Sequence, residues 1–267
     1  MIRRANNIPY LLAANDPSGS FPPVSEALTE PDGLLAIGGD LSVKRLIHAY
    51  RHGIFPWYGE NDPILWWSPD PRTILVPDEI RISRSLRKFL RKSPFEVTMD
   101  RDFRSVIHAC AMPREPGGGT WLMPEMISAY RKLHALGIAH SVEVWKDGML
   151  AGGLYGIAVG AAFFGESMFT RIDNASKIAL VYLCRRLSTW NFRLIDCQVQ
   201  TDHLLRMGAR HIPRTKFIHM LEQLRDRPSP TGCWDQPWDA SPADASPTTC
   251  EHADNMASRE TEGRHAS

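Results

Sequence analysis

The stretch HSVEVWKDGMLAGGLYGIAVGAAFFGESMF (residues 140–169) decides the fold, because it alternates short apolar runs with turn residues. HSVEVW ends at the turn KDG, MLAGGLYG ends at IAVG, and AAFFGESMF follows. Runs of this length separated by turns predict three consecutive strands that pair antiparallel. The centre of the molecule is therefore predicted to be a β-meander.

Apolar residues at helical spacing lie on both sides of the meander. The predicted helices are 43–53, 83–92, 123–137, 175–190 and the short segment 202–208, with Ser42 and Asn174 as N-caps and Gly53 and Gly137 as stops. Further strands are predicted at TILVP (73–77), FRLIDCQV (192–199) and RHIPRTKF (210–217), the last at a sheet edge because of its proline. These elements together predict an α+β fold with a mostly antiparallel sheet flanked by helices.

Composition divides the chain into three parts. Residues 1–70 hold short apolar pieces between many prolines and glycines, which predicts a small N-terminal domain. Residues 71–227 carry the regular periodicity and form the predicted main domain. Residues 228–267 are acidic and rich in Pro and Ser, so this tail is predicted to be largely disordered, with Trp234 and Trp238 packing on the body.

Length and composition exclude several classes of protein. A chain of 267 residues that is 43% hydrophobic and 23% charged is typical of a globular protein. No stretch approaches the roughly 18 consecutive apolar residues of a membrane span. The five cysteines are widely spaced without a C-x-x-C pair, which argues for a reducing, cytoplasmic compartment and against a disulfide framework or a zinc site.

The charge distribution is compatible with a polyanionic partner but does not establish one. The net charge is +1, but the tail holds two basic and seven acidic residues, so residues 1–227 carry +6. Within that body, RISRSLRKFLRK (81–92) contains no acid. Its six cations could contact a phosphate backbone, or they could be a solvated helix face. They are Arg81, Arg84, Arg87, Lys88, Arg91 and Lys92.

Tryptophans in glycine- and proline-rich segments are candidate stacking platforms for a nucleic-acid base. Trp57 lies in FPWY, and Trp121 follows three glycines in GGGTW. The alternative is a small core filled by indole rings, which is the interpretation we favour for Trp66 and Trp67.

Three polar residues interrupt the apolar strands. Glu166 stands among phenylalanines and methionine, so its carboxylate is expected to meet a cation, either internal or on a ligand. Asp196 and Gln198 alternate with apolar residues in LIDCQ and are expected to share one face of their strand. That pair is either a structural polar network or part of a cleft.

Several signatures of cofactor chemistry are absent from the sequence. It has no phosphate-binding Walker loop, dinucleotide fingerprint, G-x-S-x-G elbow or metal-spaced His/Cys cluster. The spacing Q/R-x-x-G-x-G/A of the loop in acetyl-CoA users occurs at REPGGG (114–119), but that stretch does not directly follow a predicted strand. We therefore expect no cofactor and no metal, and an acyl donor other than acetyl-CoA.

From about Phe21 to about Leu224 the chain resembles the bacterial leucyl/phenylalanyl-tRNA–protein transferases. The segments that carry the resemblance are GLLAIGGDLS (33–42), GIFPW (53–57), PILWWSPDPR (63–72), GTW (119–121), HSVEVW (140–145), FGESMF (164–169), NASK (174–177) and LIDCQ (194–198). The resemblance implies a small N-terminal domain followed by an N-acetyltransferase-like (acyl-CoA N-acyltransferase-like) domain.

The resemblance also implies a role for each candidate residue. Asp196 and Gln198 would be catalytic, at the reacting amine, and Glu166 would bind the acceptor's first side chain. Trp57 and Trp121 would hold the 3′-terminal adenosine, and the cations of 81–92 would meet the tRNA backbone. The aminoacyl side chain would enter a pocket of Leu154 (often Met in the family), Phe163, Met168, Leu180 and Ile195.

The reaction implied is transfer of Leu or Phe, and less readily Met, from aminoacyl-tRNA to the α-amino group of proteins that begin with Arg or Lys. This would mark those proteins for N-end-rule degradation. The partners would be aminoacyl-tRNA and the acceptor protein, without a membrane, and the enzyme would be a cytoplasmic monomer. The alternatives are a non-catalytic RNA-binding module and a small-molecule N-acyltransferase.

Overall fold

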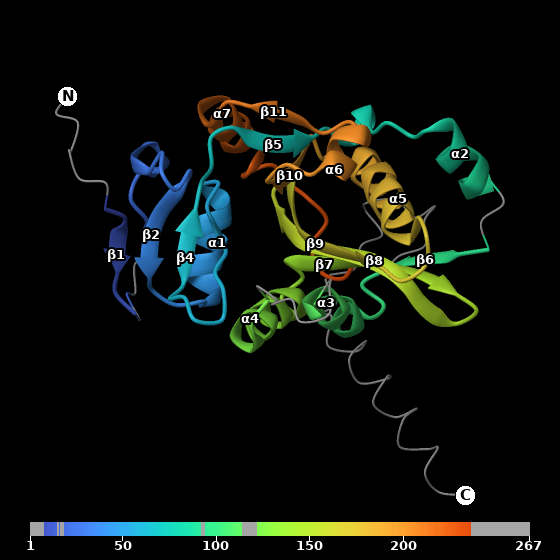
Figure 1. Cartoon of the computed structure of the whole chain (residues 1–267), viewed down its shortest axis with the longest axis horizontal. Coiled ribbons are helices and arrows are strands. Elements are labelled where there is room, and N and C mark those ends of the chain that lie inside the picture. The colour runs from blue at the N-terminus through green and yellow to red at the C-terminus, as the bar shows by residue number, and fades with distance from the viewer. Residues whose placement is uncertain (1–7, 15, 17–18, 92–93, 114–121, 236–267) are drawn as a thin grey trace, which may run out of the picture.

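The computed structural model describes residues 8–14, 16, 19–91, 94–113 and 122–235, and contains two β-sheets (Figure 1). The first sheet has the strand order β1-β2-β4-β3, in which only β1 and β2 pair parallel. Its strands are β1 (Tyr10–Leu12), β2 (Leu34–Gly38), β3 (Phe55–Pro56) and β4 (Leu65–Trp67). Helix α1 (Val43–Arg51) packs beside this sheet.

Helix α1 begins and ends where the sequence predicts. The Ser42 side chain accepts a hydrogen bond from the backbone N–H of Arg45 at the first turn. Gly53 follows the helix with φ +73°, a left-handed conformation that glycine adopts without strain. This helix carries Tyr50 into the interior, where the residue is fully buried.

The second sheet has the order β11-β5-β10-β9-β8-β7-β6 and contains the predicted meander. Its strands are β5 (Arg72–Leu75), β6 (Glu96–Met99), β7 (Ala139–Lys146), β8 (Met149–Val159), β9 (Ala162–Thr170), β10 (Leu194–Gln198) and β11 (Arg210–Ile212). Every pairing is antiparallel except that of β9 with β10. The predicted α+β architecture with a mostly antiparallel sheet is confirmed.

The sequence prediction is wrong at 210–217, which is not one edge strand. Strand β11 ends at Ile212, and Pro213 begins α7. Proline has no N–H to give a sheet ladder, and its fixed φ suits a helix start.

The sequence analysis also did not predict strand β6 or helix α3. The helices that accompany this sheet are α2 (Arg84–Arg91), α3 (Phe103–Ala111), α4 (Pro124–Ala135), α5 (Ala175–Thr189), α6 (Asp202–Arg206) and α7 (Arg214–Leu224), with 3-10 turns at Val24–Glu26 and Pro77–Glu79.

The second sheet separates two apolar cores. Helices α3 and α4 cover one face and α5 covers the other (Figure 1). The α3/α4 core continues into the N-terminal sheet and includes Tyr50, Trp66 and Tyr130. The α5 core includes Leu154, Phe163 and Trp234. Two cores on opposite faces place the second sheet at the centre of the molecule.

The chain after α7 returns to the body. Trp234 is fully buried, which confirms the prediction that it packs there, whereas Trp238 lies outside the described residues. Cys110, Cys184 and Cys197 form no disulfide bond, whereas Cys233 is disulfide-bonded, a bond that the sequence argument against a disulfide framework did not anticipate. No helix among the described residues has the length and apolarity to cross a membrane.

Candidate functional site

The site lies where β9 and β10 separate. These parallel strands pair only from Ala162 to Phe164, opposite Leu194 to Asp196. Beyond that point Glu166 continues on β9 and Gln198 ends β10. The two side chains meet across the opening, where Gln198 Nε2 donates a hydrogen bond of 2.9 Å to Glu166 Oε1. The backbone ladder joins the two strands up to Phe164 and Asp196, and beyond it the side chains of Glu166 and Gln198 connect them.

A β-bulge determines which way Glu166 points. In the pairing of β8 with β9, Gly156 faces Gly165 and Tyr155 faces Ser167, so Glu166 is the extra residue. Without the extra residue, side chains would alternate strictly along β9. With it, Phe163 and Met168 both contact the α5 core, although they are an odd number of positions apart. Glu166 instead turns toward the tyrosines of the α3/α4 core.

Two buried tyrosines donate to the Glu166 carboxylate. The Tyr50 hydroxyl of α1 lies 2.9 Å from Oε1, and the Tyr130 hydroxyl of α4 lies 2.8 Å from Oε2. The two hydroxyls are 2.7 Å apart. Desolvation raises the pKa of Glu166 to about 7, although the hydrogen bonds from Tyr130, Tyr50 and Gln198 act in the opposite direction. Glu166 has no cationic partner among the described residues.

Asp196 is held behind the opening by Arg72 of β5. Arg72 Nε and Nη2 donate to the two carboxylate oxygens at 2.8 and 2.6 Å, and neither side chain is exposed. The guanidinium lies between the rings of Phe55 and Phe217, 4.8 and 4.7 Å from their centroids. Asp196 therefore belongs to a rigid buried pair rather than to the accessible surface.

The same carboxylate fixes the backbone of Gln198. Asp196 Oδ1 accepts a 2.9 Å hydrogen bond from the Gln198 N–H. Gln198 has φ +60°, and the register of β10 with β5 shifts between Asp196 and Gln198. A left-handed residue is uncommon outside glycine and needs such local support. Nε2 is bound to Glu166, and no donor to the amide oxygen of Gln198 is found among the described residues, so this oxygen can accept a hydrogen bond from a ligand.

The five residues predicted to line a side-chain pocket come together on the α5 face. Leu154 and Met168 are register partners across β8 and β9, and Phe163 and Ile195 are partners across β9 and β10. Leu180 of α5 belongs to the same core. All are buried except Met168, which is partly buried.

Of the two candidate stacking tryptophans, Trp57 is described and Trp121 lies outside the described residues. Trp57 is 47% exposed, and its carbonyl accepts a 2.6 Å hydrogen bond from the indole of Trp67. The next residue, Tyr58, donates to Glu125 at the start of α4 at 3.2 Å. That contact ties the Trp57 segment to the first turn of α4. Trp66 is fully buried, as expected of a core residue.

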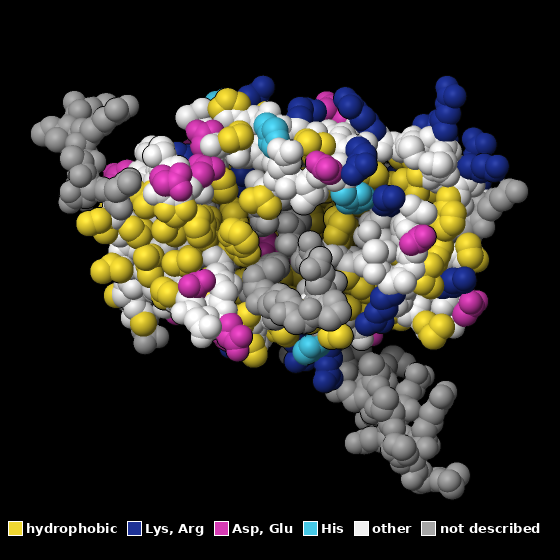
Figure 2. All heavy atoms as spheres, viewed as in Figure 1, with side chains coloured by type: hydrophobic (Ala, Val, Ile, Leu, Met, Phe, Trp, Pro, Cys, Tyr) yellow, Lys and Arg dark blue, Asp and Glu magenta, His cyan; other side chains and the backbone are white. Residues whose placement is uncertain are grey.

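The basic segment forms an exposed helix at one end of the molecule, where Figure 2 shows Lys and Arg side chains gathered over α2. Its buried residue is Leu86. Lys92 lies outside the described residues. Among the cations that the structure does describe in this segment, none forms an ion pair with a described acid: Arg81, Arg84, Arg87, Lys88 and Arg91.

Sequence reasoning missed Tyr50, Tyr130 and Arg72. Arg72 is the last residue of PILWWSPDPR, one of the segments that carry the family resemblance. Its place in that segment is the signal that could have identified Arg72 as a site residue. The two tyrosines lie on apolar faces of their helices, where aromatic side chains are common, so they did not stand out in the sequence. Within the described ranges, no three His, Cys, Asp or Glu side chains are arranged to hold a metal ion.

Two family models match this chain. The family model described as leucyl/phenylalanyl-tRNA protein transferase matches residues 74–222, and the model of its N-terminal domain matches residues 39–70. A solved GCN5-related N-acetyltransferase from Kribbella flavida is similar at 11% identity, with a TM-score of 0.32, over 62% of this chain and 58% of that chain.

Three relatives are much more similar, and each carries the name leucyl/phenylalanyl-tRNA–protein transferase. The Azotobacter vinelandii protein is 60% identical over 215 residues, covering 80% of this chain and 95% of its own length. The Nitrosomonas europaea protein is 58% identical over 214 residues, covering 80% and 91%. The Pseudomonas aeruginosa protein is 60% identical over 212 residues, covering 79% and 93%. The chain therefore belongs to the leucyl/phenylalanyl-tRNA protein transferase family of aminoacyltransferases.

Proposed function

We propose that this enzyme transfers Leu or Phe, and less readily Met, from aminoacyl-tRNA to the α-amino group of proteins that begin with Arg or Lys. The observation that carries the proposal is the contact of Gln198 with Glu166 at the strand separation. There a free amide oxygen lies beside a carboxylate that has only neutral hydrogen-bond donors among the described residues. An acceptor that starts with Arg or Lys supplies both an amine and a cation.

Gln198 orients the attacking amine in this proposal. Its amide oxygen accepts a hydrogen bond from the amine, and Asp196 with Arg72 holds the Gln198 backbone in place. The amine nitrogen bonds to the ester carbonyl carbon, the bond from that carbon to the tRNA 3′ oxygen breaks, and the tRNA leaves. One amine proton passes to the departing 3′ oxygen, directly or through water or a neighbouring tRNA hydroxyl, because an amide is too weak a base to keep it. An aminoacyl ester is already activated, so positioning alone contributes several kcal/mol.

Glu166 recognises the first side chain of the acceptor. A partly buried carboxylate without a counter-cation gains a strong charge-assisted hydrogen bond when an Arg or Lys head group arrives. The desolvation that raises its pKa to about 7 makes this recognition sensitive to pH near neutrality. Tyr50 and Tyr130 keep the carboxylate aimed at the opening.

The aminoacyl side chain enters the pocket on the α5 face, between the register pairs Leu154–Met168 and Phe163–Ile195. An apolar pocket separates side chains that differ by one methylene by roughly 1–3 kcal/mol. Leu, Phe and Met are accommodated there because they are unbranched at Cβ, whereas Ile and Val fit poorly.

The tRNA is held by stacking and by charge. Trp57 and Trp121 take the 3′-terminal adenosine, and the exposed ring of Trp57 supports this assignment. The unpaired cations of α2 contact the backbone of the acceptor stem, which requires binding to weaken steeply as salt rises. The product is a protein with a destabilising N-terminus for N-end-rule degradation in the cytoplasm, made by a monomeric enzyme.

One assay separates the proposal from a non-catalytic RNA-binding module and from a small-molecule N-acyltransferase. Purified enzyme is mixed with radiolabelled leucyl-tRNA and a protein that begins with Arg, and label in the protein is measured. We expect transfer to that protein and not to the same protein beginning with Gly. Binding of tRNA without transfer would favour the RNA-binding module, and transfer from leucyl-CoA but not from leucyl-tRNA would favour the N-acyltransferase.

A further inference from the structure

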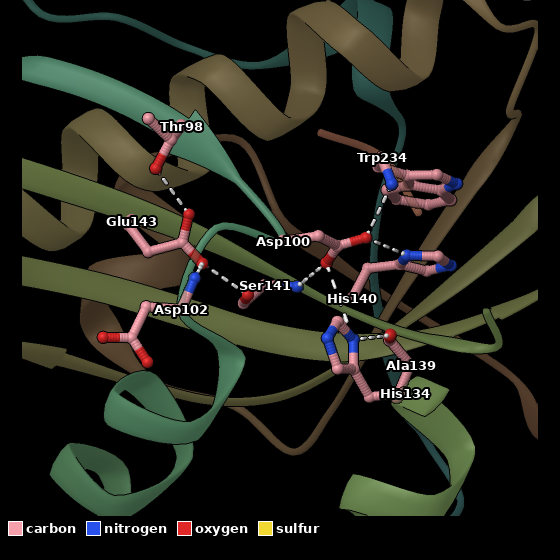
Figure 3. A network of polar contacts seen from close by, with 9 residues as sticks. All are labelled: Thr98, Asp100, Asp102, His134, Ala139, His140, Ser141, Glu143 and Trp234. Carbon is pink, nitrogen blue, oxygen red and sulfur yellow. Dashed lines mark hydrogen bonds and ion pairs between the residues drawn. The ribbon is translucent and has the colours of Figure 1, made fainter. Parts of the chain in front are cut away.

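Trp234 packs in the same core as the residues of the predicted side-chain pocket, although it comes from the irregular segment that follows α7. The residue is fully buried in the α5 core. Its ring stacks flat on the His140 imidazole of β7, with centroids 3.5 Å apart and an interplanar angle of 3° (Figure 3). Trp190 and Phe192 meet its ring edge-on at 4.9 and 5.9 Å. The indole is therefore enclosed on several sides.

A buried carboxylate fixes the backbone of this tryptophan. Asp100 Oδ2 accepts hydrogen bonds of 2.7 Å from the Trp234 N–H and from His140 Nδ1 (Figure 3). Its Oδ1 accepts from the Ser141 N–H at 2.8 Å, and His134 Nδ1 lies 3.9 Å away. Hydrogen bonds to a charged acceptor are roughly twice as strong as neutral ones. Asp100 thus fastens the C-terminal segment to the start of β7.

The enclosed ring of Trp234 contacts Phe163. The centroids of the two rings are 6.0 Å apart, and neither side chain is exposed. Phe163 is the register partner of Ile195 and is one of the five predicted pocket residues. Protein interiors are close-packed, so a side chain cannot retreat unless the atoms behind it move or are removed. The position of Phe163 is therefore limited by Trp234.

We propose that Trp234 is a positioning residue that sets the depth of the aminoacyl side-chain pocket by holding Phe163 from behind. The inference rests on the proposed function, because it assumes that Leu154, Phe163, Met168, Leu180 and Ile195 receive the transferred side chain. The proposal gives the segment after α7 a role in the choice of amino acid, in addition to its packing in the hydrophobic core.

The test is substrate competition with Trp234→Leu. Leucyl-tRNA and phenylalanyl-tRNA are supplied together, and the ratio of Phe to Leu transferred to an Arg-starting protein is measured. Loss of the indole lets Phe163 move back, so we expect the pocket to deepen and the Phe/Leu ratio to rise at least about 5-fold over wild type. The ratio does not depend on how much of the preparation is folded, so a purely structural defect leaves it unchanged.

Trp190→Leu is the matched control. Trp190 is a tryptophan of the same core that packs on Trp234, but it makes no ring contact with Phe163 in the described structure. We expect this variant to lose stability and keep the wild-type ratio. If Trp234→Leu yields no active protein, the same competition is measured with Trp234→Phe, for which we expect a smaller rise of the Phe/Leu ratio, about 2-fold.

The possible outcomes distinguish a failure of the inference about Trp234 from a failure of the proposed function. A ratio for the Trp234 variants that equals wild type, or an equal shift in Trp190→Leu, would overturn the inference and leave the proposed function standing. A wild-type enzyme that transfers neither amino acid would overturn the proposed function, and the inference with it.

Discussion

Arg72 and Asp196 form a two-point ion pair between β5 and β10, and neither side chain reaches solvent. The pair connects three parts of the molecule, because the guanidinium lies between Phe55 of the N-terminal sheet and Phe217 of α7. Its carboxylate also holds the Gln198 N–H. The position of the Gln198 amide thus depends on contacts well outside the site.

Removing the charge of Asp196 is expected to cost both stability and turnover. Asp196→Asn leaves the Arg72 guanidinium buried without a counter-ion, which costs about 3–5 kcal/mol of the free energy of unfolding. Urea denaturation measures this loss. The control is Asp78→Asn, whose partner Arg193 is exposed, and a change below about 1 kcal/mol is expected there. At temperatures where both variants are folded, kcat should fall for Asp196→Asn alone, and normal kcat would refute the role given to this pair.

Gln198→Glu tests the amide directly. A second carboxylate would stand beside Glu166, and like charges at hydrogen-bond distance cannot both ionise at neutral pH. We expect kcat to fall at least about 10-fold, with the KM for aminoacyl-tRNA nearly unchanged. Steady-state kinetics with each substrate varied in turn measure both values. Near-normal turnover would show that Gln198 does not aim the amine.

Glu166→Gln is expected to affect the acceptor far more than the tRNA. The carboxylate is the proposed partner of the acceptor's first side chain, so the KM for an Arg-starting protein should rise at least about 10-fold. The KM for leucyl-tRNA should stay within about 2-fold. Glu96→Gln is a suitable control, because Glu96 of β6 is an exposed acid that pairs with Arg101. Equal losses for both substrates would contradict the assignment.

The free energy of unfolding near neutral pH should depend on the ionisation of the Glu166 carboxylate. The pKa of Glu166 is raised to about 7 from its ordinary 4.5, so between these values the folded chain holds a proton that the unfolded chain releases. This stabilising contribution is complete below pH 4.5 and is lost as pH rises through 7. Glu166→Gln cannot titrate, so its free energy of unfolding relative to wild type should increase by roughly 2–3 kcal/mol from pH 5 to pH 8. A pH-independent difference would contradict the raised pKa.

The two tyrosines should tune that pKa. Tyr130→Phe removes a donor that stabilises the ionised carboxylate, so the pKa of Glu166 should rise further. The midpoint of the pH dependence of the acceptor KM should then move to higher pH. Tyr58→Phe is the control, since its hydroxyl donates to Glu125 instead. An unmoved midpoint in Tyr130→Phe would mean that Glu166 does not govern this pH dependence.

The fold class was predictable from sequence because local patterns specify local elements. KDG marks the first turn of the meander, and Ser42 and Gly53 mark the ends of α1. The prediction of a turn at IAVG is wrong for Ile157, Ala158 and Val159, because β8 runs to Val159 and only Gly160 lies in the turn. Helix α7 was missed because RHIPRTKF contains both strand-like and helix-like residues, and only its packing against the rest of the chain decides between them. Short ambiguous segments of this kind take their structure from tertiary contacts.

The sequence by itself determined the meander, the basic helix and the polar residues Glu166, Asp196 and Gln198, because each is a pattern within a few neighbouring residues. Only the tertiary structure decided what those residues meet. The bulge that turns Glu166 toward Tyr50 and Tyr130, the pairing of Asp196 with Arg72, and the anchoring of Trp234 by Asp100 each join segments at least 36 positions apart. No local periodicity encodes such a contact, since it depends on how whole sheets and helices pack.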